Sequence, residues 1–316
     1  MTATGSAVET LRLGSRRSAL ALAQARAVAG VLQQAGHPSE LVEVVTEGDR
    51  SAAAVADFGG TGVFVTELRQ RLLAGEIDLA VHSLKDLPTA PVDGIALAAV
   101  PVREDPRDAL VSRDGVRLAA LPAGARIGTG SPRRMAQLRA LRRGYDVVPL
   151  RGNVDTRLRR LADGELHAIV VAAAGLARLN RLDEASELLT PEQMLPAPGQ
   201  GALAVECRAA DQDLVGVLRT ALEHAPTRAI VTAERTLLAE LEAGCSAPLG
   251  ALAESAADQL TLHAVVADVA GQHLIRRSAT GTPSAAVALG KRLAADLLAA
   301  GAAELMAPPR MIGDQA

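Results

Sequence analysis

One pattern of helix, glycine stop, acidic residue and apolar run occurs twice in this chain. Arg71-Leu-Leu-Ala-Gly-Glu-Ile-Asp-Leu-Ala-Val81 resembles Arg160-Leu-Ala-Asp-Gly-Glu-Leu-His-Ala-Ile-Val170, with Gly75 matching Gly164. Because each copy supplies one strand to a sheet and one helix to cover it, the repeat predicts two similar α/β lobes. The strand ends of both lobes should then face a cleft between them, which is where open α/β sheets bind ligands.

The first of these apolar runs, residues 77–81, leads into a group of polar and ionisable side chains. They are His82, Ser83, Lys85 and Asp86. Prolines at positions 88 and 91 cannot continue a sheet ladder, so a fixed loop is predicted at this strand end. Lys85 is one of only two lysines among 33 basic residues, which makes it a candidate for a position that needs a compact point charge. Taken alone, Asp86 is more typical of a carboxylate that caps a turn.

Arginine is concentrated between residues 126 and 160, which hold ten arginines and two acidic residues. Ile127-Gly-Thr-Gly-Ser-Pro-Arg-Arg134 is typical of a strand, a loop and a helix that begins at Pro132. Val147 to Arg151 is a second strand that ends in arginine before a helix start. Guanidinium groups at such turns suit a ligand with several carboxylates or phosphates. The arginines of the intervening helix are expected to be solvated: Arg139, Arg142 and Arg143.

A third strand-to-helix turn lies near the N-terminus. Residues 11–18 read as a short strand and a Gly-Ser turn, and residues 19–34 repeat alanine and leucine at helical spacing. Ser15 or Ser18 can cap this helix, and Arg16 and Arg17 lie beside its first backbone amides, so an anion site is one interpretation. An ordinary serine-capped helix is the other.

Length and composition restrict the class of protein. A chain of 316 residues favours two or three domains. A net charge of -3, no tryptophan, one tyrosine and two phenylalanines argue against a nucleic-acid-binding regulator, since base-stacking platforms and overall basic charge are both absent. No signal-peptide core or apolar run of membrane-spanning length is found, so we expect a cytoplasmic protein with no membrane partner.

The two cysteines differ in context, and neither has metal-ligand spacing. Cys207 lies inside an apolar run that is predicted to return to the first sheet, and it reads as an inert buried thiol. Cys245 lies in Glu242-Ala-Gly-Cys-Ser-Ala-Pro248, a loop of small residues that leaves its sulfur approachable. We expect lobe 1 in residues 1–101 and 197–219, lobe 2 in 102–196, and a small C-terminal α+β domain in 220–316.

These motifs together closely resemble the hydroxymethylbilane synthase, or porphobilinogen deaminase, family over nearly the whole chain. The matching segments are Gly-Ser-Arg-Arg-Ser at 14–18, Val-His-Ser-Leu-Lys-Asp at 81–86, Arg-Glu-Asp-Pro-Arg-Asp at 103–108, Arg-Gly-Asn-Val at 151–154, Pro-Gly-Gln-Gly-Ala at 198–202 and Ala-Gly-Cys at 243–245. The resemblance implies two lobes like those of type II periplasmic binding proteins plus a third domain. It also implies a monomer without metal that carries dipyrromethane on a thioether to Cys245.

The implied reaction joins four porphobilinogen units with loss of ammonia and then releases linear hydroxymethylbilane by hydrolysis. The resemblance assigns catalysis to Asp86. It assigns cofactor contacts to Ser18, Ser83, Lys85, Thr129, Ser131, Arg133 and Arg134. It assigns contacts with porphobilinogen and the growing polypyrrole chain to Arg16, Arg151, Gly152, Arg157, Arg178 and Gln200.

This chemistry suits those residue types. Loss of ammonia leaves a cationic electrophile, which a carboxylate at the pyrrole N–H groups stabilises while it moves the proton. A thiolate is a soft nucleophile that captures such an electrophile. Every pyrrole ring also carries an acetate and a propionate, which the arginines would hold.

The sequence departs from the family pattern at four positions. Asp57 and Thr61 stand in a small-residue loop, 47–62, where many relatives have lysines, so we expect no direct contact between this loop and substrate carboxylates. Gly130 stands where serine is frequent and Asp155 where glycine is common. One anion-binding hydroxyl is therefore expected to be missing, and the second arginine turn is expected to be less basic.

A non-catalytic, two-lobed protein that binds anionic ligands is the main alternative. It would carry a signal peptide or lipid anchor, and it has no use for an approachable Cys245.

Overall fold

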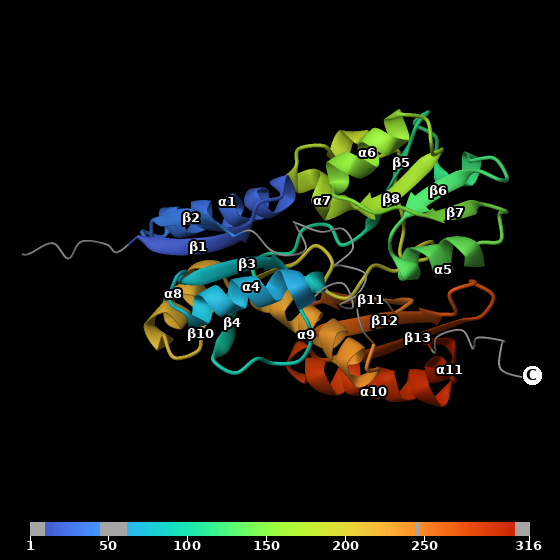
Figure 1. Ribbon diagram of the computed structural model, residues 1–316. Helices are drawn as coiled ribbons and strands as arrows, with labels where there is room; N and C mark the ends of the chain where they lie inside the picture. The colour runs from blue at the N-terminus through green and yellow to red at the C-terminus, as the bar shows by residue number, and fades with distance from the viewer. Residues whose placement is uncertain (1–9, 45–61, 244–246, 307–316) are drawn as a thin grey trace, which may run out of the picture.

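The first lobe is built on a mixed five-stranded sheet of order β2-β1-β3-β10-β4 (Figure 1). This computed structural model describes residues 10–44, 62–243 and 247–306, with side chains from 65 onward in the second range. The strands are β1 (Leu11–Arg16), β2 (Ser39–Val44), β3 (Leu79–Ser83), β4 (Ile95–Ala99) and β10 (Leu203–Arg208). Strand β10 runs antiparallel between β3 and β4, so the predicted return of residues 203–207 to the first sheet is confirmed.

The second lobe repeats this layout with a sheet of order β7-β6-β8-β5-β9. Its strands are β5 (Asp108–Ser112), β6 (Arg126–Thr129), β7 (Asp146–Pro149), β8 (Ala168–Ala172) and β9 (Glu187–Leu188). Strand β6 is parallel to β7 and β8, whereas β5 is antiparallel to β8 and β9. The two copies of the sequence repeat end in β3 and β8, which are the central strands of their sheets. The predicted pair of similar α/β lobes is therefore confirmed.

Helices cover both faces of each sheet (Figure 1). Lobe 1 has α1 (Ala19–Gln34) and α8 (Gln212–Leu222) packed together on one face and α4 (Gly62–Leu73) on the other. Lobe 2 has α5 (Pro132–Ala140) on one face, and α6 (Val154–Ala162) and α7 (Ala173–Arg178) on the other. The buried residues Ala25, Val28 and Leu32 of α1 recur at helical spacing, which is why this helix packs along one stripe.

The C-terminal unit is a three-stranded antiparallel sheet with helices against it. Its strands are β11 (Leu249–Ala256), β12 (Gln259–Ala267) and β13 (Leu274–Gly281). Its helices are α9 (Ala225–Glu240), α10 (Ala286–Ala299) and α11 (Ala302–Met306). The predicted α+β character is confirmed, although β11 was not foreseen.

A buried carboxylate joins this unit to the segments that cross between the lobes. Glu234 of α9 is 0 % exposed and accepts hydrogen bonds from both Nη atoms of Arg103, at 2.7 and 3.1 Å. It also accepts the backbone N–H groups of Gly199 at 2.6 Å and Ala253 at 2.8 Å. Two segments cross between the lobes: residues 100–107 connect β4 to β5, and residues 189–202 connect β9 to β10. Arg103 belongs to the first crossing, Gly199 to the second and Ala253 to β11. The three parts of the fold therefore meet at one side chain.

The expectation of solvated arginines on α5 is wrong for Arg139. Its Nη1 donates to the backbone oxygen of Val269 at 2.7 Å, and Nη2 of Arg142, just past the helix, donates to Gln272 O at 3.4 Å. Both acceptors lie in the turn between β12 and β13. These arginines attach lobe 2 to the C-terminal unit, a contact between distant segments that helical spacing does not reveal.

Candidate active site

A short 3₁₀ helix, Leu84–Asp86, follows β3 and presents Lys85 and Asp86. Leu84 and Leu87 are buried on either side of them, so the two ionisable groups lie between two apolar anchors. Arg235 of α9 fixes this turn by donating to the backbone oxygens of Leu87 at 2.9 Å and Pro88 at 2.8 Å. Asp86 is left exposed, while Lys85 is half-buried. The predicted fixed loop at this strand end is confirmed.

Lys85 lies among groups of both signs. Burial lowers its pKa to about 8; the carboxylates of Asp86 and Asp108 oppose this shift, and the guanidinium groups of Arg134 and Arg133 add to it. Its Nζ lies 3.4 Å from Oε1 of Gln200. The ammonium group of Lys85 therefore loses its proton more readily than that of an ordinary lysine.

The strand-to-helix turn between β6 and α5 is closely packed. Ser131 is the N-cap of α5 and accepts from the backbone N–H of Arg134 at 3.5 Å, while its own N–H donates to Oγ1 of Thr129 at 3.3 Å. A Cβ atom at Gly130 would lie 2.7 Å from the backbone oxygen of Leu150, at the end of β7. In this chain the two strand ends lie so close together that a side chain at position 130 would force one of them to shift.

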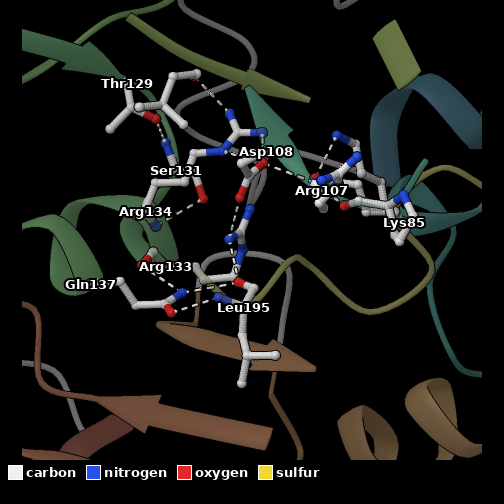
Figure 2. Close-up of polar contacts among 12 residues, drawn as sticks. Lys85, Arg107, Asp108, Thr129, Ser131, Arg133, Arg134, Gln137 and Leu195 are labelled. Carbon is white, nitrogen blue, oxygen red and sulfur yellow. Dashed lines mark hydrogen bonds and ion pairs between the residues drawn. The ribbon is translucent and has the colours of Figure 1, made fainter. Parts of the chain in front are cut away.

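Arg133 and Arg134 approach Asp108 from two sides (Figure 2). Arg133 Nη1 donates to Oδ2 at 2.7 Å, and Arg134 donates to Oδ1 from Nε at 3.0 Å and from Nη2 at 2.7 Å. All three side chains are buried. Burial alone would raise the pKa of Asp108, but the two guanidinium groups hold it well below its usual range. Further donors of the two arginines bind the backbone oxygens of Leu195 at 2.6 Å and Val170 at 3.0 Å.

Gln200 connects this ion cluster to Lys85. Its Nε2 donates to Asp108 Oδ1 and to the backbone oxygen of Pro106, both at 2.8 Å, and its Oε1 faces Lys85. The side chain is fully buried, so both ends of the amide are engaged within the protein. The next residue, Gly201, has φ +86° and would place a Cβ 2.4 Å from the backbone oxygen of Glu104, so the two crossings touch here. Arg178 Nη2 donates to Gly201 O at 2.6 Å.

The turn between β7 and α6 presents a second group of predicted residues. Arg151 and Gly152 are exposed, and Nε of Arg157 donates to Gly152 O at 2.8 Å. Burial, with Arg134 nearby, lowers the pKa of Arg157 to about 10. Asp155 pairs with Arg181, whose Nη1 donates to Oδ1 at 2.7 Å. Its negative charge is therefore paired with Arg181 and not with Arg157, the arginine expected to contact substrate.

At the first turn, Ser18 caps α1 by accepting the N–H of Ala21 at 3.3 Å, and half-buried Arg16 ends β1. Ser83, at the end of β3, is held by Gln24 of α1 at 2.9 Å. Arg17 points elsewhere and pairs with Glu43 at 3.4 Å.

The structure thus joins Lys85, Gln200, Arg133 and Arg134 in one network, with Thr129 and Ser131 in the turn beside it. The strand ends and helix starts around this network carry Arg16, Ser18, Ser83, Arg151, Gly152 and Arg157. Arg178 is the last residue of α7. Cys245, Asp57 and Thr61 lie outside the described residues. Cys207 is buried, and burial raises the pKa of its thiol to about 11, as expected of an inert cysteine.

Sequence reasoning missed Asp108 and Gln24. Asp108 ends the charged run 103–108, and the available signals were the place of this run among the family-like segments and an acidic residue directly before an apolar strand. Within the described ranges, no group of three or more His, Cys, Asp or Glu is arranged to hold a metal ion. In the same ranges, no helix is both long and apolar enough to cross a bilayer.

Comparisons with known proteins agree on one family. Residues 11–216 match the family described as "Porphobilinogen deaminase, dipyromethane cofactor binding domain", and residues 229–299 match "Porphobilinogen deaminase, C-terminal domain". The "Porphobilinogen deaminase" of Acidothermus cellulolyticus is 56% identical over 316 residues, covering 98% of this chain and 95% of the relative. "Porphobilinogen deaminase 1" of Streptomyces coelicolor is 55% identical over 312 residues, covering 94% of this chain and 98% of the relative.

Among solved structures, a putative methionine-binding lipoprotein from Bacillus subtilis aligns with a TM-score of 0.42 at 13% identity. The alignment covers 69% of this chain and 92% of the lipoprotein. Similarity at this level carries no argument about function.

Proposed function

The chain belongs to the porphobilinogen deaminase family, and from this premise we propose how its own residues build hydroxymethylbilane from porphobilinogen. The enzyme is a transferase of tetrapyrrole biosynthesis that joins porphobilinogen units head to tail with loss of ammonia. Hydrolysis then releases the linear product.

The observation that carries this proposal is the buried network that links the strand ends of the two lobes. It contains three cationic groups, those of Lys85, Arg133 and Arg134, and one carboxylate, that of Asp108. The network as a whole therefore has an excess of positive charge next to exposed Asp86. Acetate and propionate groups of a pyrrole chain are the complementary ligands.

The residues present fit a dipyrromethane cofactor. Nε of Arg133 is buried and has no hydrogen-bond partner among the described residues, so a donor remains for an acceptor from outside the protein. We infer that Ser18, Ser83, Lys85, Thr129, Ser131, Arg133 and Arg134 hold the carboxylates of this group and that Cys245 binds it covalently. When bound, the cofactor supplies the primer to which substrate units are added.

Asp86 is the proposed catalytic residue. It is the exposed carboxylate of the turn, and the apolar anchors Leu84 and Leu87 fix its place beside Lys85. An ionised carboxylate there stabilises positive charge on a pyrrole N–H during bond formation and accepts the proton that leaves. Substrate carboxylates are assigned to the outer residues Arg16, Arg151, Gly152, Arg157 and Arg178. Gln200 was expected among them, but it is fully buried with both ends of its amide engaged, so its proposed role is to connect Asp108 and Lys85.

Further parts of the proposal concern the molecule as a whole. We propose three domains: lobe 1 in residues 1–101 and 197–219, lobe 2 in residues 102–196, and a C-terminal domain in residues 220–316. We propose that it acts in the cytoplasm as a monomer.

Purified protein tests the proposal directly. With porphobilinogen it should release ammonia and a product that cyclises without enzyme to a coloured porphyrin after oxidation. Intact-protein mass spectrometry should find added mass equal to two pyrrole units, absent from Cys245→Ser. A bare-chain mass and no ammonia would favour the non-catalytic binding protein.

A further inference from the structure

We propose that Asp108 is a positioning residue that holds both guanidinium groups of α5 in place and, through Gln200, fixes Lys85 of the opposite lobe. The inference deepens the proposed function and rests on it, because Lys85, Arg133 and Arg134 are the groups assigned to the cofactor.

The geometry of Asp108 carries the argument. It is the first residue of β5, directly after one crossing, and it is 0 % exposed. Both carboxylate oxygens are used: Oδ2 by Arg133, and Oδ1 by Arg134 and Gln200, at the distances given above. Arg134 is held by Asp108 at two nitrogens, Nε and Nη2, which restricts rotation of its guanidinium group. Arg133 is held at Nη1, which donates both to Asp108 and to the backbone oxygen of Leu195. Asp108 therefore helps to fix the direction in which the remaining N–H groups of both arginines point.

The contacts of Asp108 cross from one lobe to the other. Arg133 and Arg134 belong to α5 of lobe 2, Gln200 belongs to the return crossing, and Lys85 belongs to the turn after β3 of lobe 1. Gln200 cannot move toward a ligand without breaking its bond to Asp108 or to the backbone oxygen of Pro106. The network thus sets the spacing between the cationic groups of the two lobes before any ligand arrives.

The charge of Asp108 also acts on Lys85. Four charged groups influence this ammonium: Asp86 from its own turn, Asp108 from β5, and Arg133 and Arg134 from α5. Asp108 favours the charged form, and the two arginines oppose it. If Asp108 were neutral, burial and the arginines would lower the pKa of Lys85 further below about 8. Activity that needs the ammonium would then be lost at a lower pH.

Two variants and one control separate positioning from simple stabilisation. Asp108→Asn keeps the shape of the side chain but removes its charge and one acceptor. Gln200→Met keeps the length of the side chain but removes the link between Asp108 and Lys85. The matched control is Asp78→Asn, since Asp78 also binds two arginines, Arg12 at 2.7 Å and Arg208 at 3.1 Å, but at the other end of β3.

Each purified variant is measured by intact mass, for the covalently bound pyrrole units, by the pH profile of kcat/KM, and by thermal unfolding. Wild-type turnover and mass test the proposed function separately, so its failure is seen before any variant is made. In Asp108→Asn we expect incomplete loading, a fall in kcat/KM of about tenfold or more, and an alkaline limb moved to lower pH. Gln200→Met should move the alkaline limb of the kcat/KM profile to lower pH by a smaller amount. Asp78→Asn should leave both the covalently bound pyrrole mass and the alkaline limb unchanged.

The proposal is overturned if Asp108→Asn folds, loads fully and keeps the wild-type pH profile. It is also overturned if loading and activity fall only in proportion to the fraction folded, with the alkaline limb in place, because a structural role alone predicts that result. Should Asp108→Asn fail to fold, Gln200→Met decides: a wild-type limb and full loading in that variant reject the proposal, and a shifted limb supports it.

Discussion

Glu234 offers the sharpest test of how the three parts of the molecule are held together. Glu234→Gln retains the size of the side chain but removes its negative charge. One amide nitrogen then faces two donors that a carboxylate oxygen accepted: one Nη of Arg103 and the backbone amide of either Ala253 or Gly199. The side chain of Arg103 is only 8% exposed, so water cannot replace the lost acceptor.

The size of the effect follows from this burial. Removing one partner of a buried ion pair costs about 3–5 kcal/mol, because the other charge stays buried without compensation. An unsatisfied buried amide costs a further ~1–3 kcal/mol when it cannot find water. These contributions overlap, so we expect a loss of about 4 kcal/mol in the free energy of unfolding of the unit that contains α9 and β11. Glu165→Gln is the control: its pair with Arg160 is 2.6 Å long but 42% and 47% exposed, and such surface pairs contribute about 0.2–1 kcal/mol.

Urea denaturation followed by circular dichroism gives the stability difference. Native-state hydrogen exchange then locates it, because the amides of Gly199 and Ala253 should lose protection in Glu234→Gln and keep it in Glu165→Gln. The assignment of Glu234 as the joining residue is wrong if the free energy of unfolding of Glu234→Gln lies within about 1 kcal/mol of the wild-type value. It is also wrong if the amides of Gly199 and Ala253 both stay protected from exchange.

Three further outcomes are expected. Asp86→Asn should keep the covalently bound pyrrole mass while kcat falls about 100-fold or more, and substantial remaining turnover would exclude the proposed role. Gly130→Ala should lower the melting temperature and raise KM, because its Cβ would lie 2.7 Å from Leu150 O and push the two strand ends apart; unchanged values would show that the turn can yield. Glu206 has a pKa lowered to about 2: burial raises it, but the contact with His82 at 3.3 Å and the hydrogen bonds from Arg69 outweigh that effect. Its stabilisation is present above pH 4.5, its ordinary value, and is lost as pH falls toward about 2, so Glu206→Gln should flatten the stability profile in that window.

The sequence was most informative where a local pattern repeats or stops. The glycine stop shared by Gly75 and Gly164 located the central strand of each sheet, and Pro132 located the start of α5. Both signals depend on backbone geometry that is set by a few neighbouring residues. The apolar run around Cys207, which was predicted to return to the first sheet, is β10, and it follows the proline- and glycine-rich segment 195–202.

What the sequence could not supply was pairing between distant polar groups. Nothing local indicates that Asp108 faces two arginines of α5, or that Arg139 reaches the turn after β12. The first is a buried ion cluster, and the second is a contact between lobe 2 and the C-terminal unit. Strand β11 was missed because its apolar run is short: the buried residues are Leu249 to Ala253, of which three are alanine or glycine, and the last three residues of the strand are exposed.

The position of β10 has a consequence for synthesis on the ribosome. All the strands of lobe 2 lie within residues 108–188, so that sheet is complete as soon as one continuous segment has emerged. Strands β3 and β4 of lobe 1 instead wait for β10, whose residues 203–208 are made after the whole of lobe 2. Until then, both strands have open edges on the growing chain, and such edges invite pairing with other molecules. We therefore expect the second lobe to fold first and the N-terminal lobe to be the part of the nascent chain that depends on chaperone protection.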